Sequence, residues 1–295
     1  IMLGMVYIAY VISGMVGGAH VIIDHAAQAG KFEFWPKLDA RDIVAFTAAW
    51  ATMALGSIPQ QDVFQRVASA KNERTAGNGS VIGGVLYFCF AFVPIFLAYS
   101  ALMIDPALIE RYIHTDSQQI LPRLILTHAP FIAQVFFFGA LISAILSCSA
   151  ATLLAPSVTV AENLLRPFVP DISDRHFLRM LRVVVLLFAC AVLTFALISD
   201  ETIYGMVENA YKITLAGAFT PLAFGLYWKK ATNQGAALAM IAGLSTWLTL
   251  EAVHPEGYFP PQFAGLLAAI TGMLIGSLMP QWYRRHSGPA HPHAA

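Results

Sequence analysis

Charged residues are scarce in this 295-residue chain. Asp, Glu, Lys and Arg together make up 12% of it, whereas soluble domains carry about 25% charged residues. Apolar residues make up 58%, and the mean hydropathy is +0.65. The formal net charge of zero gives no indication of nucleic-acid binding. This composition argues against a soluble globular domain and leaves little room for one beside a membrane region.

Paired cysteines and enzyme motifs are also missing. The three cysteines, Cys89, Cys148 and Cys190, all lie in apolar runs. Their odd number and irregular spacing argue against a disulfide framework or a cysteine metal site. The sequence has no phosphate-binding glycine loop, no HExxH and no GxSxG, which are the motifs that would support common enzyme chemistries. We therefore predict that the chain is neither an enzyme nor the carrier of an organic cofactor.

What the sequence does contain is long uncharged hydrophobic runs. A run of about 18 apolar residues is long enough to cross a bilayer. We predict eight spans, of which the second and fifth are short: 1–23, 43–59, 81–104, 131–154, 183–199, 204–227, 235–253 and 263–280. The predicted fold class is all-α, a polytopic transmembrane helix bundle. It forms one membrane domain over residues 1–283, followed by a disordered cytoplasmic tail over 284–295.

The ends of the chain and its basic residues suggest how it sits in the membrane. The chain opens on Ile1 inside a hydrophobic run, without a basic segment or a cleavage site, so this run is not a signal peptide. We expect the sequence to be a piece of a longer protein. Eleven Lys and Arg residues lie in the loops on one side of the spans and five on the other. The positive-inside rule then predicts that the C-terminus lies in the cytoplasm. We expect the protein in the cell membrane, which in a bacterium is the inner membrane.

The most informative stretch runs from Trp50 to Ala76, where an apolar span meets Gly56-Ser57-Ile58-Pro59 and then two glutamines. Gly and Pro weaken a helix, and transporters place their solute sites at such breaks. Glutamine amides both donate and accept hydrogen bonds, which suits a small polar or zwitterionic organic solute. The predicted solute-binding residues are Met53, Gly56, Ser57, Gln60 and Gln61. The alternative is a simple kink at the end of a helix.

Glu208 and Lys212 are ionisable residues within the sixth predicted span. They are spaced i,i+4 with the acid first, the more favourable order for an ion pair. Charged groups inside a span usually face a cavity or a partner. We expect either a cavity-facing pair with a role in coupling or gating, or a structural ion pair near the outer mouth.

The segment 105–130 separates the third and fourth predicted spans. It contains three prolines, and its stretch from Gln118 to His128 is amphipathic. This pattern favours a surface or re-entrant helix over a plain loop.

Three stretches of the chain resemble the sodium:solute symporter family. GSIPQQDVFQRVASAKNERTA is similar to the family's broken helix and the loop that follows. Gly139–Leu165 resembles its sodium-binding helix, and Gly225–Leu244 resembles its C-terminal signature, with Gly225, Gly235 and Gly243 at the expected spacing. Within the family, choline-transporter-like members are the most similar. Because Gln60 stands where those members have an aromatic residue, and aromatic rings bind quaternary ammonium groups, we do not predict choline as the solute.

The resemblance implies the inverted-repeat fold of the leucine transporter, without that fold's first core helices. It also implies half of a sodium site, formed by the Ala144 carbonyl, Ser147 and Cys148. Na+ prefers oxygen ligands, and Ala144 and Ser147 lie three residues apart on one helix face. Cys148 stands where relatives usually have a second hydroxyl, and a thiol is a soft, poor ligand for Na+. Coupling to H+ is therefore an alternative, and so is a purely structural role of the serines in helix packing.

These observations together predict secondary active symport of a small polar organic solute, driven by a sodium gradient. The competing class is a solute-sensing membrane domain of a signalling protein; a membrane-embedded enzyme has no supporting residues. The transport prediction requires that the regions around Pro59 and Ser147 border one hydrated chamber in the membrane.

Overall fold

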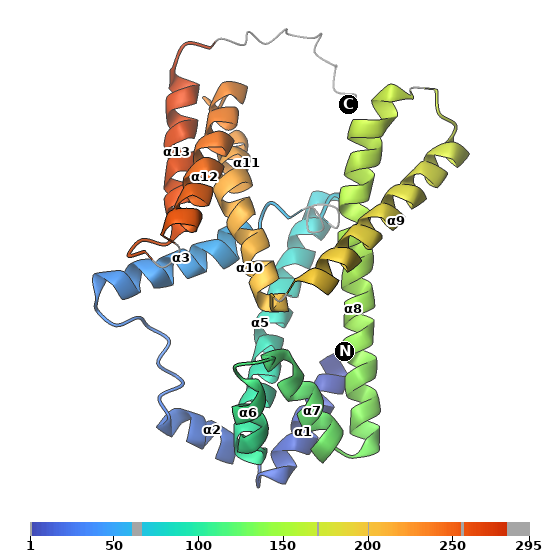
Figure 1. Cartoon of the computed structure of the whole chain (residues 1–295), viewed down its shortest axis with the longest axis vertical. Coiled ribbons are helices and arrows are strands. Elements are labelled where there is room, and N and C mark those ends of the chain that lie inside the picture. The colour runs from blue at the N-terminus through green and yellow to red at the C-terminus, as the bar shows by residue number, and fades with distance from the viewer. Residues whose placement is uncertain (1, 61–66, 170, 200, 255–256, 282–295) are drawn as a thin grey trace. The chain divides into compact units, whose positions relative to one another are not determined.

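The structure is a computed structural model that describes residues 2–60, 67–169, 171–199, 201–254 and 257–281. Every regular element among these residues is a helix (Figure 1). The helices form two compact units. The first unit draws on residues 1–35 and 61–202, and the second on residues 36–60 and 203–295. The predicted tail over 284–295 lies outside the described residues.

The first unit is built around long apolar helices. Its α-helices are α1 (Met2–Met15), α2 (Ala19–Gln28), α5 (Glu73–Ile104), α6 (Pro106–Tyr112), α7 (Ile120–His128), α8 (Phe131–Thr159) and α9 (Asp174–Ile198). Three short elements complete it: η1 (Ser117–Gln119), the π-helix η2 (Val160–Leu165) and η3 (Arg166–Phe168), of which η2 and η3 extend α8.

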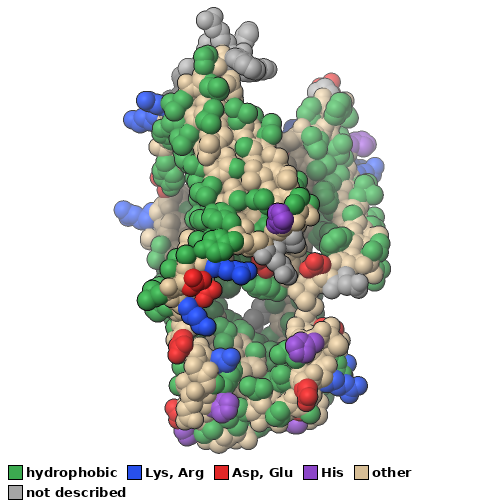
Figure 2. All heavy atoms as spheres, turned by 60° about the vertical axis from the view of Figure 1, so that its left-hand side comes forward, with side chains coloured by type: hydrophobic (Ala, Val, Ile, Leu, Met, Phe, Trp, Pro, Cys, Tyr) green, Lys and Arg blue, Asp and Glu red, His purple; other side chains and the backbone are tan. Residues whose placement is uncertain are grey.

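Four helices of the first unit, α1, α5, α7 and α8, supply its hydrophobic core. The core consists of Ile8, Ile12, Leu97, Ala101, Leu124, Ile125, Ala129, Ala133 and Phe137. Outside this core the helices expose large apolar side chains, and only 6% of the most hydrophobic window of α5 is buried. Figure 2 shows hydrophobic side chains over much of the visible face. Apolar surface on this scale is what lipid contact requires.

The second unit contains the predicted helix break. Its elements are α3 (Ala40–Gly56), α10 (Ile203–Thr214), the π-helix η4 (Leu215–Phe219), α11 (Thr220–Tyr227), α12 (Asn233–Val253) and α13 (Pro261–Leu278). In Figure 1, α12 and α13 lie side by side. Ala239, Ala269 and Met273 are buried between them. Small residues at this interface let the two backbones approach closely, as is common in membrane helix pairs.

The all-α prediction is confirmed, and the structure refines the spans. Among the described residues, five helical segments are long and apolar enough to cross a membrane, namely α5, α8 with its extensions, α9, α12 and α13. The described residues of the first predicted span, 2–23, fall in α1, the break after it and the start of α2. The two helices are bent by 78° and would add a sixth span if counted together. The break lies at Gly17 and Gly18, whose φ angles of 89° and 123° favour glycine. The short fifth prediction is the end of α9, which begins with two basic turns at Asp174.

The two remaining predicted spans are short or interrupted. Helix α3 has 17 residues, starts at Ala40 and ends at Gly56. Residues 203–227 are helical throughout, but η4 divides them into α10 and α11. A π-helix inside a longer helix changes the register of its hydrogen bonds and is often found at functional sites.

Candidate functional site

Helix α3 ends at Gly56, where the sequence predicts the break. Ser57 to Pro59 form a turn in which the amide of Gln60 donates to the Ser57 carbonyl at 3.3 Å. The amide of Ile58 donates to the Leu55 carbonyl at 3.2 Å. Helix α3 therefore ends in a tight turn over Ser57–Pro59.

Thr214 connects this break to α10 within the second unit. Its hydroxyl lies 2.5 Å from the carbonyl oxygen of Gly56 and donates to it. The same hydroxyl lies 3.1 Å from the carbonyl of Tyr211. The last carbonyls of a helix have no partner within the helix, and in a membrane each needs one from elsewhere. Thr214 supplies that partner for Gly56, at the point where α10 passes into η4.

Gly56 is buried because α10 packs directly against it. A Cβ atom at this position would lie 2.5 Å from the carbonyl oxygen of Tyr211, far inside van der Waals contact. Only glycine lets the two backbones come this close. The break is therefore a packed junction between α3 and α10, and sequence analysis had identified only one side of it.

The other predicted solute-binding residues line the same turn. Met53, Ser57 and Gln60 are half-buried, and the Ser57 hydroxyl donates to the carbonyl of Ala54 at 3.0 Å. Gln61 lies outside the described residues. The described part of the predicted set is thus contiguous around the end of α3, and its role in solute binding remains a prediction.

Glu208 and Lys212 form the predicted ion pair on α10. Lys212 Nζ lies 3.3 Å from Glu208 Oε1, and the exposed fractions of the two side chains are 16% and 32%. Lys212 follows Tyr211 directly and Glu208 is three residues before Tyr211, so both side chains start within one helical turn of the residue whose carbonyl faces Gly56. A partly buried pair beside the break fits a coupling or gating role, although the geometry alone also suits a structural pair.

Lys212→Met should separate these two roles. The substitution leaves Glu208 without its cation, so we expect solute uptake or its cation dependence to fall by on the order of tenfold, the equivalent of ~1.4 kcal/mol. Uptake and membrane expression would be measured for Lys212→Met and for the exposed control Lys229→Met. A structural pair would give a different result. Lys212→Met would then lose expression, and Glu208→Gln/Lys212→Met would regain both expression and full uptake.

The residues of the predicted sodium half site lie in the middle of α8, in the first unit. Ala144 is half-buried, whereas Ser147 and Cys148 are exposed. The carbonyl of Cys148 accepts a hydrogen bond of 2.9 Å from the Thr152 hydroxyl. Among the described residues, the Ser147 hydroxyl has no hydrogen-bond partner, and its role in ion binding stays a prediction. Because α3 belongs to the second unit, the shared chamber of Pro59 and Ser147 stays a prediction.

The segment between α5 and α8 folds as the amphipathic pattern predicts. Helix α7 buries Leu124 and Ile125 and exposes Arg123. Asp105 begins α6, because its Oδ1 accepts the Leu108 amide at 3.0 Å. Its Oδ2 lies 3.1 Å from Nε2 of His128, at the end of α7. The hydrogen bonds from the His128 ring and the Leu108 amide hold the pKa of the Asp105 carboxyl below its ordinary value of 3.8.

This lowered pKa predicts how the α6–α7 connection depends on pH. A carboxyl whose folded pKa is depressed stabilises the fold above its ordinary pKa, and that stabilisation is lost as the pH falls through the lowered value. Asp105→Asn keeps a helix-capping oxygen but loses the charge opposite His128. We expect faster hydrogen exchange at the α6 and α7 amides of Asp105→Asn at neutral pH, and a larger increase in Asp105→Ala. If the α6 and α7 amides exchange no faster in Asp105→Asn than in the control Glu110→Gln, the Asp105 carboxylate does not stabilise the α6–α7 connection.

Comparison with known proteins gives the chain its family. A profile described as "Sodium:solute symporter family" matches residues 1–243. The human high affinity choline transporter 1 is 24% identical over 242 residues, covering 76% of this chain and 39% of that protein. The sodium/pantothenate symporter of Escherichia coli is 27% identical over 245 residues, covering 80% of this chain and 49% of that protein. The chain thus spans less than half the length of these relatives.

A solved structure shows the same fold. It is that of a Na+-coupled sialic acid symporter in a substrate-bound outward-open state, with a TM-score of 0.70 at 19% sequence identity. The alignment covers 93% of this chain and 58% of that one. The fold is accordingly that of the leucine-transporter class, as predicted. The family profile covers well over half of the chain, and the chain is therefore a multi-pass membrane member of the sodium:solute symporter family, a family of transporters and not of enzymes.

Proposed function

We propose that this protein carries out secondary active symport of a small polar organic solute, driven by a sodium gradient. The observation that carries the proposal is the match to the sodium:solute symporter family over residues 1–243. Among its relatives are proteins named as sodium/pantothenate and sodium/proline symporters. Their solutes differ, but each combines a carboxylate with other polar groups. We assign the solute of this protein to the class of small polar organic molecules, and experiment will identify it.

The solute is assigned to the end of α3. Met53, Gly56, Ser57 and Gln60 surround the turn that ends α3, where the backbone leaves the regular helical pattern. Transporters place polar solutes at such helix breaks near the membrane midplane. Gln60 and Gln61 add amide donors and acceptors, which suit a carboxylate or a zwitterion. Glu208 and Lys212, close to the junction, are assigned to coupling or gating.

The coupling ion is assigned to α8. The carbonyl of Ala144 and the hydroxyl of Ser147 are the oxygen ligands, and Cys148 is the weaker third position. The three residues make up half of a site; the remaining ligands would come from elsewhere in the protein. We place the protein in the cell membrane with its C-terminus in the cytoplasm, because the basic residues are concentrated in loops on that side.

Uptake measurements on the complete natural protein test this proposal. Proteoliposomes would be given labelled proline, pantothenate, choline and sialic acid, under an inward sodium gradient, a proton gradient or neither. Accumulation that needs sodium supports the proposal. Accumulation that needs only a proton gradient would show that the coupling ion is H+ and not Na+. Solute binding without flux under every gradient would identify a sensor.

Variants of α8 test the ion site separately. Ser147→Ala removes a ligand, so the sodium concentration for half-maximal uptake should rise by on the order of tenfold, the equivalent of ~1.4 kcal/mol. Cys148→Ser supplies a hydroxyl oxygen as a ligand and should lower the sodium concentration for half-maximal uptake. Ser149 lies about 200° around the helix from Ser147, and Ser149→Ala is the matched control. An equal effect of the two alanine substitutions would indicate helix packing rather than ion binding.

A further inference from the structure

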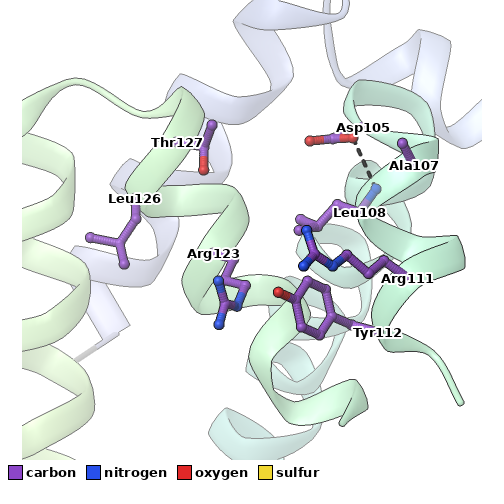
Figure 3. Close-up of a pocket in the computed structure, with 8 residues that line it drawn as sticks. All are labelled: Asp105, Ala107, Leu108, Arg111, Tyr112, Arg123, Leu126 and Thr127. Carbon is purple, nitrogen blue, oxygen red and sulfur yellow. Dashed lines mark hydrogen bonds between the residues drawn. The ribbon is translucent and has the colours of Figure 1, made fainter. Parts of the chain in front are cut away.

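A pocket with two arginines lies in the first unit, where α5 ends and α8 begins. It has a volume of about 360 Å³ and is formed by α6, α7 and the turn before α6 (Figure 3). Its lining residues are Asp105, Ala107, Leu108, Arg111, Tyr112, Arg123, Leu126 and Thr127. Both α5 and α8 are long and apolar enough to span a membrane. The pocket therefore lies at the level where the chain leaves the apolar layer, beside the lipid headgroups.

Both arginines of the pocket contact the same aromatic ring, that of Tyr112. The guanidinium carbons of Arg111 and Arg123 lie 5.4 Å and 4.6 Å from the centre of the Tyr112 ring, so they are no more than about 10 Å apart. Arg111 comes from α6 and Arg123 from α7, and Figure 3 shows both side chains at the Tyr112 ring. Cation–π contact holds each guanidinium in place. Two exposed positive charges on one ring raise the local positive potential, which favours an anion that contacts both guanidinium groups.

No carboxylate of the described chain supplies that anion. Neither guanidinium has an Asp or Glu oxygen within 4.0 Å among the described residues. Arg123 Nε donates to the Gln119 amide oxygen at 2.7 Å, which orients the side chain, and its terminal nitrogens have no hydrogen-bond partner among the described residues. The one carboxylate that lines the pocket, Asp105, is already bound to the Leu108 amide and the His128 ring.

The rest of the lining adds an apolar side and one hydroxyl. Leu108 is half-buried, and Leu126 is 54% exposed. Thr127 is exposed at the rim and can donate a hydrogen bond to an oxyanion. A pocket with two guanidinium groups, one hydroxyl donor and adjacent leucines suits an anion that carries several oxygens on an apolar body. Guanidinium groups match phosphate oxygens in pairs, which is why arginine is frequent in phosphate sites.

We propose that this pocket binds a phosphate group, with Arg111 and Arg123 as its two cationic ligands and Thr127 as a hydroxyl donor. The phosphate has two sources at this position, the headgroup of an anionic lipid and free phosphate in solution. The site shares no residue with the solute and sodium sites of the proposed symporter, and it does not depend on that function.

Native mass spectrometry of the purified protein would test the site directly. The protein would be offered phosphatidylglycerol or phosphatidylcholine, and phosphatidylglycerol binding would be repeated with 10 mM inorganic phosphate as competitor. We expect bound phosphatidylglycerol to fall on the order of tenfold in Arg111→Gln/Arg123→Gln, because each arginine near a membrane surface contributes measurably to binding of anionic lipid. Thermal unfolding of the same variant would check that it is folded. Arg111→Lys/Arg123→Lys keeps the charges and should lose less binding than the glutamine pair.

The matched control removes two exposed arginines of α9, in Arg175→Gln/Arg179→Gln. This control loses the same charge and should retain phosphatidylglycerol binding within about twofold of the original protein. Displacement of the lipid by inorganic phosphate would assign the site to free phosphate, and resistance to it would assign the lipid headgroup. Equal losses in the two double variants, or no loss of bound phosphatidylglycerol in Arg111→Gln/Arg123→Gln, would overturn the proposal.

Discussion

Gly243→Ala is expected to destabilise the second unit, although alanine is normally the better helix former. A Cβ at Gly243, within α12, would collide with the carbonyl oxygen of Ala216 in η4 and lie 2.9 Å from the Cβ of Ala269 in α13. Overpacking of this kind costs ~1–3 kcal/mol. It exceeds or cancels the ~1 kcal/mol that alanine gains over glycine in a helix. Thermal unfolding in detergent should show a transition several degrees lower.

Gly225→Ala is the matched control for this prediction. Gly225 belongs to the same stretch of sequence, but no atom lies within 4 Å of the Cβ that alanine would add. The substitution should leave the unfolding transition unchanged or raise it slightly, because only the helix propensity changes. If Gly225→Ala and Gly243→Ala shift the transition equally, the close packing of α12 on η4 and α13 is wrong.

Gly56→Ala should have the largest effect on transport. The added methyl group meets the Tyr211 carbonyl, so α3 must move away from α10 and the bond from the Thr214 hydroxyl to the Gly56 carbonyl must lengthen. Displacing a site by about 1 Å can cost a hundredfold in rate, and we expect sodium-driven uptake to fall by at least ~tenfold. Initial uptake rates in proteoliposomes, normalised to the amount of inserted protein, would measure this effect.

Two further variants show whether the junction itself is responsible. Gly83→Ala adds the same methyl group within α5, where nothing lies within 4 Å, and should transport normally. Thr214→Ser keeps the hydroxyl and should retain most of the uptake, whereas Thr214→Val keeps the shape and should lose much of it. Normal uptake by Gly56→Ala would rule out this junction as part of the transport path.

The candidate site shows which features local sequence can reveal. The end of α3 was predictable from Gly56 and Pro59, because both residues act on the backbone of their own helix. The Glu208–Lys212 pair was predictable for the same reason, since an i,i+4 spacing brings the side chains together on any helix. Thr214 was not identified, because its bond to Gly56 joins residues 158 positions apart. The π-helix at Leu215–Phe219 also left no signal in the hydrophobic pattern.

The glycines of the C-terminal signature also show the difference between what local sequence reveals and what helix packing decides. Gly225, Gly235 and Gly243 were identified together by their spacing, yet the structure leaves Gly225 open and packs the other two against neighbouring helices. The spacing of the three residues contains no information about which face of α12 meets α13 and η4. That depends on contacts between segments that are distant in the chain.

The sequence alone determined that this is a helical membrane protein, because a chain with so little charge and such long apolar runs can satisfy its backbone in lipid only by forming helices. It also determined where α3 stops and which family the chain resembles. Only the tertiary structure decided which groups meet that helix end, which glycines lie at close helix contacts, and that Arg111 and Arg123 share one aromatic ring. Helix formation depends on residues within a few positions of one another, whereas these contacts depend on how separate helices pack.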